Sequence, residues 1–318
     1  MDKQKVLVYG EIRDYQLAEL RKAVPEVEWL HAAGPEETRA LAPQADILLP
    51  MFRQDLEEIL ARATKLRWVH SYAAGVEGLL PLLANRPDIV LTNSAGVHAP
   101  PIAEHVMALV YAFARNLPTL LAQQARREWR RPIHTFEVHG LTMGILGLGG
   151  IGGAIAHLAR AAGMRVIGTR RHPRPMDEAE KVYGPDDTGQ VIRESDFVVI
   201  ALPLTEETRH SIGATELGWM KPEAYLINIA RGAIVDEPAL VAALREGRLR
   251  GAGLDVFEEE PLPAESPLWG MPNVVISPHV AAGTPRSRER VSQFFVSNLR
   301  RWLSGEPLEN VVCQRAGY

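Results

Sequence analysis

The 318-residue sequence predicts an α/β protein made of two doubly wound domains, each built on a parallel sheet. The chain is longer than the size at which a single core usually stops growing, which favours two domains. Short apolar runs rich in β-branched residues alternate with segments of helical periodicity. This alternation starts afresh near residue 141, so the second half predicts a second sheet.

In the first half, the runs at residues 5–9, 46–49, 66–70 and 89–92 predict strands. The segments 15–24 and 55–63 between them have the spacing of amphipathic helices. A longer helix should begin after Pro100 and Pro101 and run towards Arg115, because proline is tolerated in the first helical turn.

In the second half, strands are predicted at residues 141–146, 165–168, 197–201, 225–229, 251–254 and 274–277, and a helix at 151–162. The final helical pattern, residues 286–303, either packs locally or returns to the first domain, and periodicity does not choose between these. No linker composition marks the domain boundaries, which we place near residues 98 and 286.

Composition excludes several classes of partner. The net charge of -4 and the pI near 6.2 give no electrostatic reason to expect binding to nucleic acid or to an anionic membrane. The longest apolar run, residues 106–114, is far shorter than the roughly 20 residues of a membrane helix. The single cysteine, Cys313, fits a reducing compartment, so we expect a cytoplasmic protein with small-molecule partners.

No metal site is expected, because His70, His98, His105 and His134 lack metal-ligand spacing.

A glycine-rich segment has the spacing G-x-G-x-x-G and consists of Gly147, Leu148, Gly149, Gly150, Ile151 and Gly152. It follows a predicted strand, opens a predicted helix and precedes a second strand, which is the context of a dinucleotide-binding loop rather than of an incidental turn. In such a loop the diphosphate meets free N–H groups at the positive end of the helix dipole.

The end of the second strand predicts which dinucleotide is bound. An acidic residue normally binds the adenosine ribose there, whereas this sequence has Thr169, Arg170, Arg171 and His172. Two guanidinium groups suit the 2′-phosphate of NADP, and no carboxylate repels it. We therefore expect NADP(H) to be preferred, with NAD(H) as the alternative if these arginines are only surface residues.

Three further segments, residues 228–237, 254–262 and 277–284, each follow a predicted strand. Ligands of open α/β sheets bind beyond the carboxyl ends of the strands, so these segments should converge on the nicotinamide end of the cofactor. Together with the glycine loop, with residues 201–210 and more loosely with 72–77, they resemble the signatures of the D-isomer-specific 2-hydroxy-acid dehydrogenase family, in particular its members similar to glyoxylate/hydroxypyruvate reductase.

The resemblance implies a Rossmann cofactor domain, residues 99–285, inserted into a flavodoxin-like substrate domain of residues 1–98 plus 286–318. It also implies an enzyme that uses NAD(P)H to reduce a small 2-oxo acid to the D-2-hydroxy acid. A homodimer is expected on the same ground, with the segment around Trp129 as a candidate contact.

Carried over by position, the catalytic residues are Arg231, Glu260 and His279. Histidine is the side chain best suited to proton transfer near neutral pH, so His279 is expected to be the general acid. Glu260 would orient the imidazole and favour its protonated form. Arg231 would bind the substrate carboxylate and polarise the carbonyl. The resemblance adds backbone N–H groups that bind the carboxylate at Ala74, Gly75 and Val76.

Further cofactor contacts rest on the resemblance alone: Leu202, Pro203, Thr208, Ile229, Ala230 and Asp255. Asp255 could equally cap the end of its strand.

A nucleotide-sensing protein similar to the co-repressors of this fold is the alternative function, and the short flanks and unremarkable charge of the chain argue against it. A formate-type dehydrogenase is disfavoured because that group has Gln where Glu260 stands. Phe52 and Arg53 are expected to shape the substrate pocket, Phe52 favouring an apolar group and Arg53 a second anionic one.

Overall fold

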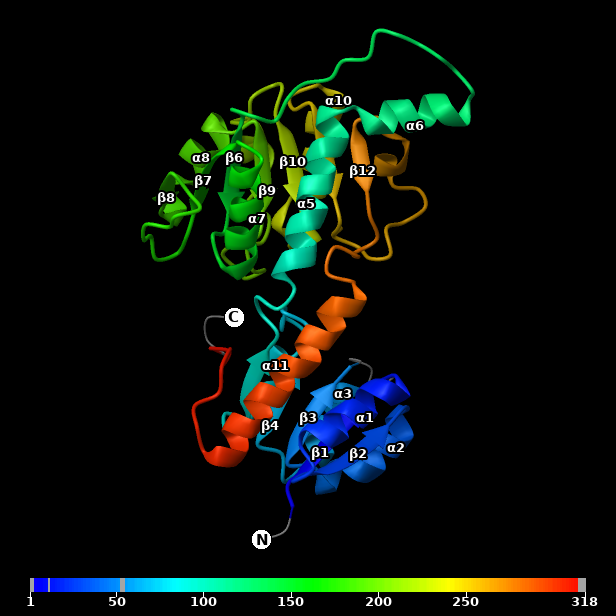
Figure 1. Cartoon of the computed structure of the whole chain (residues 1–318), viewed down its shortest axis with the longest axis vertical. Coiled ribbons are helices and arrows are strands. Elements are labelled where there is room, and N and C mark those ends of the chain that lie inside the picture. The colour runs from blue at the N-terminus through cyan, green and yellow to red at the C-terminus, as the bar shows by residue number, and fades with distance from the viewer. Residues whose placement is uncertain (1–2, 11, 52–54, 314–318) are drawn as a thin grey trace. The chain divides into compact units, whose positions relative to one another are not determined.

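The computed structural model describes residues 3–10, 12–51 and 55–313. The chain forms two compact units: unit 1 comprises residues 1–98 and 284–318, and unit 2 comprises residues 99–283. Each unit contains one sheet whose named strands all pair in parallel, and helices connect the strands (Figure 1). The predicted α/β class with two parallel sheets is confirmed.

Unit 1 has a five-stranded sheet in the order β2-β1-β3-β4-β5. Its strands are β1 (Lys5–Tyr9), β2 (Glu28–Ala32), β3 (Ile47–Pro50), β4 (Trp68–Ser71) and β5 (Val90–Asn93). Its helices are α1 (Asp14–Ala23), α2 (Pro35–Leu41), α3 (Leu56–Arg62), α4 (Leu80–Leu83) and α11 (Pro285–Ser304), with a short 3-10 turn, η1, at Ala42–Gln44.

The C-terminal helix α11 returns to unit 1. Alternate residues of the strands point to opposite faces, so Val6 and Val8 contribute to one core and Leu7 and Tyr9 to the other. The first of these cores includes Phe295 of α11, whose ring lies 5.5 Å from that of Trp68. The helical pattern at residues 286–303 therefore covers the sheet of unit 1.

Unit 2 has a seven-stranded sheet in the order β12-β11-β10-β9-β6-β7-β8. The strands are β6 (Thr142–Leu146), β7 (Arg165–Thr169), β8 (Lys181–Tyr183), β9 (Phe197–Ile200), β10 (Tyr225–Asn228), β11 (Gly251–Leu254) and β12 (Val274–Ile276). The helices are α5 (Ala99–Ala114), α6 (Leu117–Ala125), α7 (Gly150–Ala161), α8 (Thr188–Glu194), α9 (Ala214–Leu217) and α10 (Glu237–Arg245), with 3-10 turns η2 (Pro185–Asp187), η3 (Gly232–Ile234) and η4 (Pro267–Gly270).

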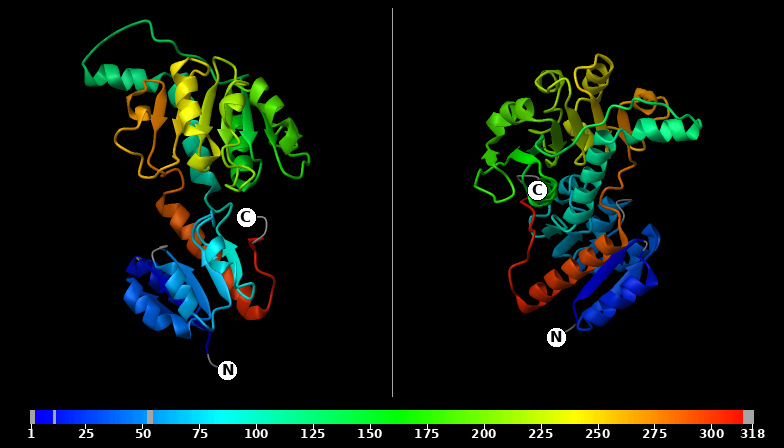
Figure 2. Two further views of the ribbon diagram at one scale, coloured as in Figure 1. Left: turned by 180° about the vertical axis from the view of Figure 1, so that it is seen from behind. Right: turned by 45° about the horizontal axis from the view of Figure 1, so that its top comes forward.

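Helices cover both faces of this second sheet. Phe197 and Val199 of β9 pack with α5 and α7, which lie in front of the sheet in Figure 1. Val198 and Ile200 pack with α8 and α10 on the other face, which the left panel of Figure 2 shows. All connections therefore cross over a face, and the carboxyl ends of the strands share one edge of the sheet.

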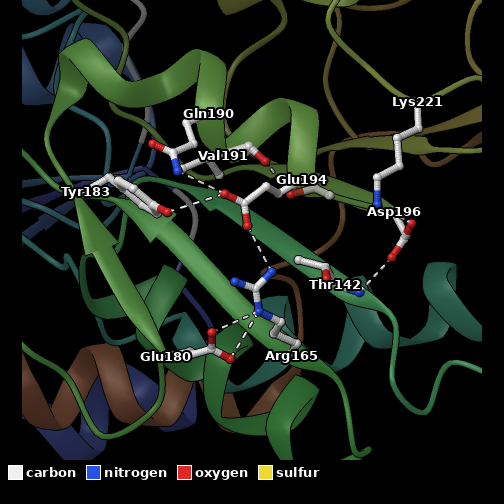
Figure 3. Close-up of polar contacts among 10 residues, drawn as sticks. Thr142, Arg165, Glu180, Tyr183, Gln190, Val191, Glu194, Asp196 and Lys221 are labelled. Atoms are coloured by element: carbon white, nitrogen blue, oxygen red, sulfur yellow. Dashed lines mark hydrogen bonds and ion pairs between the residues drawn. The ribbon is translucent and has the colours of Figure 1, made fainter.

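At the opposite, amino edge, charged groups join the strands (Figure 3). Arg165, the first residue of β7, bonds to Glu180 and to Glu194, with N···O distances of 3.0 Å in both cases. The carboxylate of Asp196 accepts a 2.8 Å hydrogen bond from the N–H of Thr142 at the start of β6. These bonds fix the relative register of the strands at their amino ends, opposite the edge at which ligands of such sheets bind.

Two strands, β2 and β8, were not predicted from the sequence. Both are at an edge of their sheet and pair on one side only. The residues of β2 are mostly half-exposed, and β8 has only three residues, so neither shows a continuous apolar run. Within the described residues, no helix is long and apolar enough to cross a bilayer.

Candidate active site

The glycine loop lies between β6 and α7. Gly147 has φ +105°, which side chains rarely tolerate, and a Cβ there would lie 2.6 Å from the carbonyl oxygen of Ala201. The N–H groups of Gly147 and Leu148 donate to the carbonyl of Thr169, at 3.2 and 2.7 Å. The loop is thus fixed between the ends of β7 and β9.

The start of α7 forms a cradle that suits an anion. A Cβ on Gly152 would come within 2.1 Å of the carbonyl oxygen of Gly147, so glycine is required for the helix to approach the loop. Gly149 caps the helix without a side chain, and a Cβ there would meet no atom within 4 Å. The first N–H groups of a helix, here at Gly150 and Ile151, have no intrahelical acceptor. Open space above backbone donors at a helix N-terminus fits a dinucleotide diphosphate.

The structure places the predicted ribose-side residues at the end of β7. Thr169 is buried, and its Oγ1 accepts a 3.3 Å hydrogen bond from the N–H of Gly147, so it braces the loop. Arg170 is half-buried beside the sulfur of Met176, at 3.7 Å. Arg171 is exposed and lies 3.7 Å from Glu207. Both guanidinium groups therefore belong to the surface at the end of the second strand.

The segment after β9 contributes Leu202, Pro203 and Thr208. The backbone N–H of Leu202 would lie 3.1 Å from a Cβ on Gly147, so this segment borders the glycine loop. The hydroxyl of Thr208 donates to the carbonyl of Pro203 at 2.7 Å and accepts from the N–H of Thr205 at 2.8 Å. Thr208 thereby fixes the shape of the segment.

Arg231 stands on a tight turn after β10. The buried amide of Asn228 accepts from the N–H of Ala230 at 3.1 Å and donates to the carbonyl of Arg231 at 3.0 Å. Ile229 and Ala230 are buried in this turn, whereas Arg231 is half-buried. We did not single out Asn228 from the sequence, although its position at a strand end was a signal.

Close backbone packing brings the arginine turn beside the segment that carries Glu260. A Cβ on Gly232 would lie 1.8 Å from the carbonyl carbon of Phe257, so only glycine fits between the two segments. The N–H of Phe257 in turn donates to Oε1 of Glu260 at 3.0 Å. Arg231 and Glu260 therefore occupy adjoining segments of the carboxyl edge.

His279 and Glu260 form a direct pair. Nδ1 of His279 lies 2.7 Å from Oε2 of Glu260. A carboxylate only accepts hydrogen bonds, so Nδ1 carries the hydrogen and Nε2 is the ring nitrogen available to a substrate. The imidazole is about half exposed, at 48%, so a small molecule can reach it.

The neighbouring glutamates have different partners. Glu258 pairs with His210, and its N–H donates to Glu237. Burial raises the pKa of Glu237, the nearby carboxylates of Glu258 and Glu259 raise it further, and the N–H of Glu258 opposes both effects. Within the described residues of this acidic run, Glu258 therefore bonds to His210, and Glu260 is the glutamate that bonds to His279.

Asp255 holds the loop that carries His279. It is 1% exposed, and its carboxylate accepts from the N–H groups of Val280 and Ala281, both at 3.0 Å. Its carbonyl accepts from the N–H of His279 at 2.8 Å. From its position after β11, the aspartate thus holds the loop that follows β12.

The predicted carboxylate-binding loop lies in unit 1, after β4. Val76 is buried, and Ala74 and Gly75 are half-exposed. Asn93 donates to the carbonyl of Ala74 at 2.8 Å, and the N–H of Ser94 donates to Ala73. No local sequence pattern indicates these supports. Phe52 and Arg53 lie outside the described residues, and within the described residues no three His, Cys, Asp or Glu side chains are grouped to hold a metal ion.

Comparison with known proteins places this geometry in a family. Residues 107–281 match the D-isomer specific 2-hydroxyacid dehydrogenase, NAD binding domain. A glyoxylate/hydroxypyruvate reductase B of Pectobacterium carotovorum is 38% identical over 98% of each chain. A D-3-phosphoglycerate dehydrogenase of Methanocaldococcus jannaschii is 34% identical over 97% of this chain, which spans 59% of that protein.

Among solved structures, an NADPH-dependent glyoxylate/hydroxypyruvate reductase of Sinorhizobium meliloti, in complex with NADP and sulfate, is similar with a TM-score of 0.88. It is 31% identical, and the alignment covers 99% of this chain and 100% of the other. The glycine loop, the strand-end segments and these similarities agree, and the chain belongs to the D-isomer specific 2-hydroxyacid dehydrogenase family.

Proposed function

We propose that this protein uses NADPH to reduce a small 2-oxo acid of the glyoxylate or hydroxypyruvate type to the D-2-hydroxy acid. The observation that carries the proposal is the pair of His279 and Glu260, joined at 2.7 Å on the same sheet edge as the glycine loop. As a member of its family the chain is an NAD(P)-dependent oxidoreductase.

Each residue of the triad has a distinct task. Arg231 binds the substrate carboxylate through its guanidinium and stabilises charge on the carbonyl oxygen. We assign further contacts with the substrate to the backbone N–H groups of Ala74, Gly75 and Val76 in unit 1. His279 delivers a proton from Nε2 to the carbonyl oxygen, and Glu260 stabilises the imidazolium through Nδ1. The hydride for the carbonyl carbon would come from the nicotinamide of a dinucleotide bound at the glycine loop.

We assign cofactor binding to a domain of residues 99–285 and substrate binding to residues 1–98 plus 286–318, bounds that differ from those of the two compact units by two residues at the second boundary. Gly147, Gly149 and Gly152 shape the diphosphate cradle at α7. Leu202, Pro203, Thr208, Ile229, Ala230 and Asp255 line the cofactor site in this proposal. The P. carotovorum and S. meliloti relatives are both reductases by name, which favours this function over the nucleotide-sensing alternative.

NADPH is the proposed cofactor because of Arg170 and Arg171. Both stand where an acidic residue would bind the ribose of NAD, and they lie at the end of β7 beside the cradle. The S. meliloti relative, described as NADPH-dependent, supports the same choice.

We also propose a cytoplasmic homodimer. The apolar residues Leu121 and Trp129, 62% and 89% exposed, lie on α6 and the segment that follows it, which extends away from the sheet in Figure 1. A second copy of this chain would cover them, as exposed apolar patches often mark interfaces. Analytical ultracentrifugation should give the dimer mass for the wild type and a shift towards monomer for Trp129→Ser; a monomeric wild type would refute the dimer.

The first experiment compares initial rates of NADPH and NADH oxidation with a panel of 2-oxo acids. We expect turnover with NADPH preferred and expect Arg170→Asp to lose that preference, because a carboxylate repels the 2′-phosphate and binds the ribose hydroxyls. Arg174→Asp, a change of the same charge at an exposed residue, is the control. Tight nucleotide binding without turnover of any acid would instead favour a sensing protein.

A further inference from the structure

One contact network behind His279 has no task in the mechanism above. His105 lies on α5, and its Nε2 is 3.0 Å from the hydroxyl of Ser277 at the end of β12. The Ser277 hydroxyl donates to Oδ1 of Asp255 at 2.5 Å, and His105 itself approaches that oxygen to 3.8 Å. From sequence spacing alone, His105 is only a histidine without the spacing of a metal ligand.

The hydrogen bonds in this network have only one consistent set of directions. The Ser277 hydroxyl has a single hydrogen, which goes to Asp255. Ser277 must then accept its bond from His105, so Nε2 of His105 carries a hydrogen. His105 thus donates to the Ser277 hydroxyl, which in turn donates to the buried carboxylate of Asp255.

That carboxylate is the anchor of the catalytic loop. Its two oxygens accept from Ser277, Val280 and Ala281, and the backbone carbonyl of Asp255 accepts from His279. His279 has φ 53°, a conformation that nonglycine residues rarely adopt without surrounding support. The position of the imidazole therefore depends on how firmly the loop is bound to Asp255.

We propose that His105 is a positioning residue for the catalytic His279, acting through Ser277 and Asp255. The inference rests on the proposed function, in which His279 is the general acid. His105 touches neither substrate nor cofactor in this proposal. Its side chain is 23% exposed, and it fixes the rotamer of Ser277, which in turn holds Oδ1 of Asp255 in place for the loop N–H of Val280.

Steady-state kinetics of two variants distinguish the effect of losing the hydrogen bond from the effect of changing the side-chain volume. His105→Leu removes the donor, whereas His105→Gln keeps an N–H at the position of Nε2. We expect the leucine variant to lower kcat about ten- to hundredfold, because small displacements of catalytic groups cost rates of this order. KM for NADPH should change by less than about twofold. The glutamine variant should regain most of kcat, and His157→Leu, at an exposed position of α7, is the matched control.

A double-variant cycle tests the route through Ser277. In a Ser277→Ala background the donor has lost its acceptor, so adding His105→Leu should lower kcat by no more than about twofold. A full further loss in that background would overturn the route. Wild-type kcat in His105→Leu, or equal losses in the leucine and glutamine variants, would overturn the proposal itself.

Hydrogen exchange tests the positioning role of His105 independently of enzyme activity. The amides of Ser277 and of residues 279–283 should exchange faster in His105→Leu than in His105→Gln and the wild type, because the loop is then less firmly held. Unchanged exchange would refute a positioning role. If the wild-type protein reduced no 2-oxo acid, the proposed function would fail while this measurement still tested the contact.

Discussion

The buried histidine of β4 should make unit 1 sensitive to acid. His70 is 0% exposed, and burial lowers its pKa from 6.5 to about 3. The hydroxyl of Thr92 accepts from the indole N–H of Trp68 at 2.8 Å and lies 2.7 Å from Nδ1 of His70. Ser94 donates to Ser71, so it accepts from Nε2 of His70. These bonds are all made by a neutral imidazole with its hydrogen on Nε2.

The sign of the effect follows from proton binding. Between pH 6.5 and about 3 the unfolded chain protonates this histidine and the folded chain does not, so the free energy of unfolding falls as the pH falls. Taking these two pKa values, the loss from His70 alone is about 2 kcal/mol between about pH 7.5 and 5, and about 3 kcal/mol by about pH 4.

The assay is urea unfolding, followed by tryptophan fluorescence, over this pH range. His70→Gln removes the titrating group, so its free energy of unfolding should depend less on pH by about 2 kcal/mol, whatever its stability near neutral pH. His172→Gln changes an exposed histidine of unit 2 and serves as the control. If the wild type and His70→Gln lost the same free energy between these pH values, burial of His70 would not be the source of the acid sensitivity.

Three further predictions concern unit 2. His279→Ala should lower kcat about 10²- to 10⁴-fold, the usual contribution of a general acid, while NADPH titrated by fluorescence still binds with wild-type affinity; wild-type turnover would overturn its role. Arg231→Ala should chiefly raise KM for the 2-oxo acid in steady-state kinetics, and an unchanged KM would contradict its contact with the carboxylate. Gly152→Ala should destabilise unit 2 by about 1–3 kcal/mol in thermal unfolding and weaken NADPH binding, because its Cβ would lie 2.1 Å from the carbonyl of Gly147; Gly270→Ala, where a Cβ meets no atom within 4 Å, is the control.

Central strands were predictable because they are buried on both faces. β1 and β11 have the bounds that the apolar runs predicted, and β9 and β10 differ from them by one residue at the end. Such strands are continuous runs of apolar residues, which local pattern detects. The side to which α11 returns was not predictable from periodicity, because the choice depends on which sheet face is left uncovered.

The candidate site was predictable where it follows strand order. Arg231, Glu260 and His279 all stand just beyond β10, β11 and β12, three consecutive strands in the sheet. Their supports were not predictable, because hydrogen bonds between distant segments leave no local pattern. His105 and Ser277 are 172 positions apart in the chain, and only the packing of α5 on the sheet brings them together.

His279 is held by two carboxylates that act on different parts of it. Glu260 binds the ring at Nδ1, whereas Asp255 accepts the backbone N–H of His279 at its carbonyl and those of Val280 and Ala281 at its carboxylate. Within the described residues, the bond to Glu260 is the one that orients the exposed ring, so the precision of proton delivery depends on the buried aspartate that holds the backbone. A histidine with φ 53° in a short loop would otherwise relax to a commoner conformation. The geometry of the reactive nitrogen therefore originates in the core of unit 2 rather than at its surface.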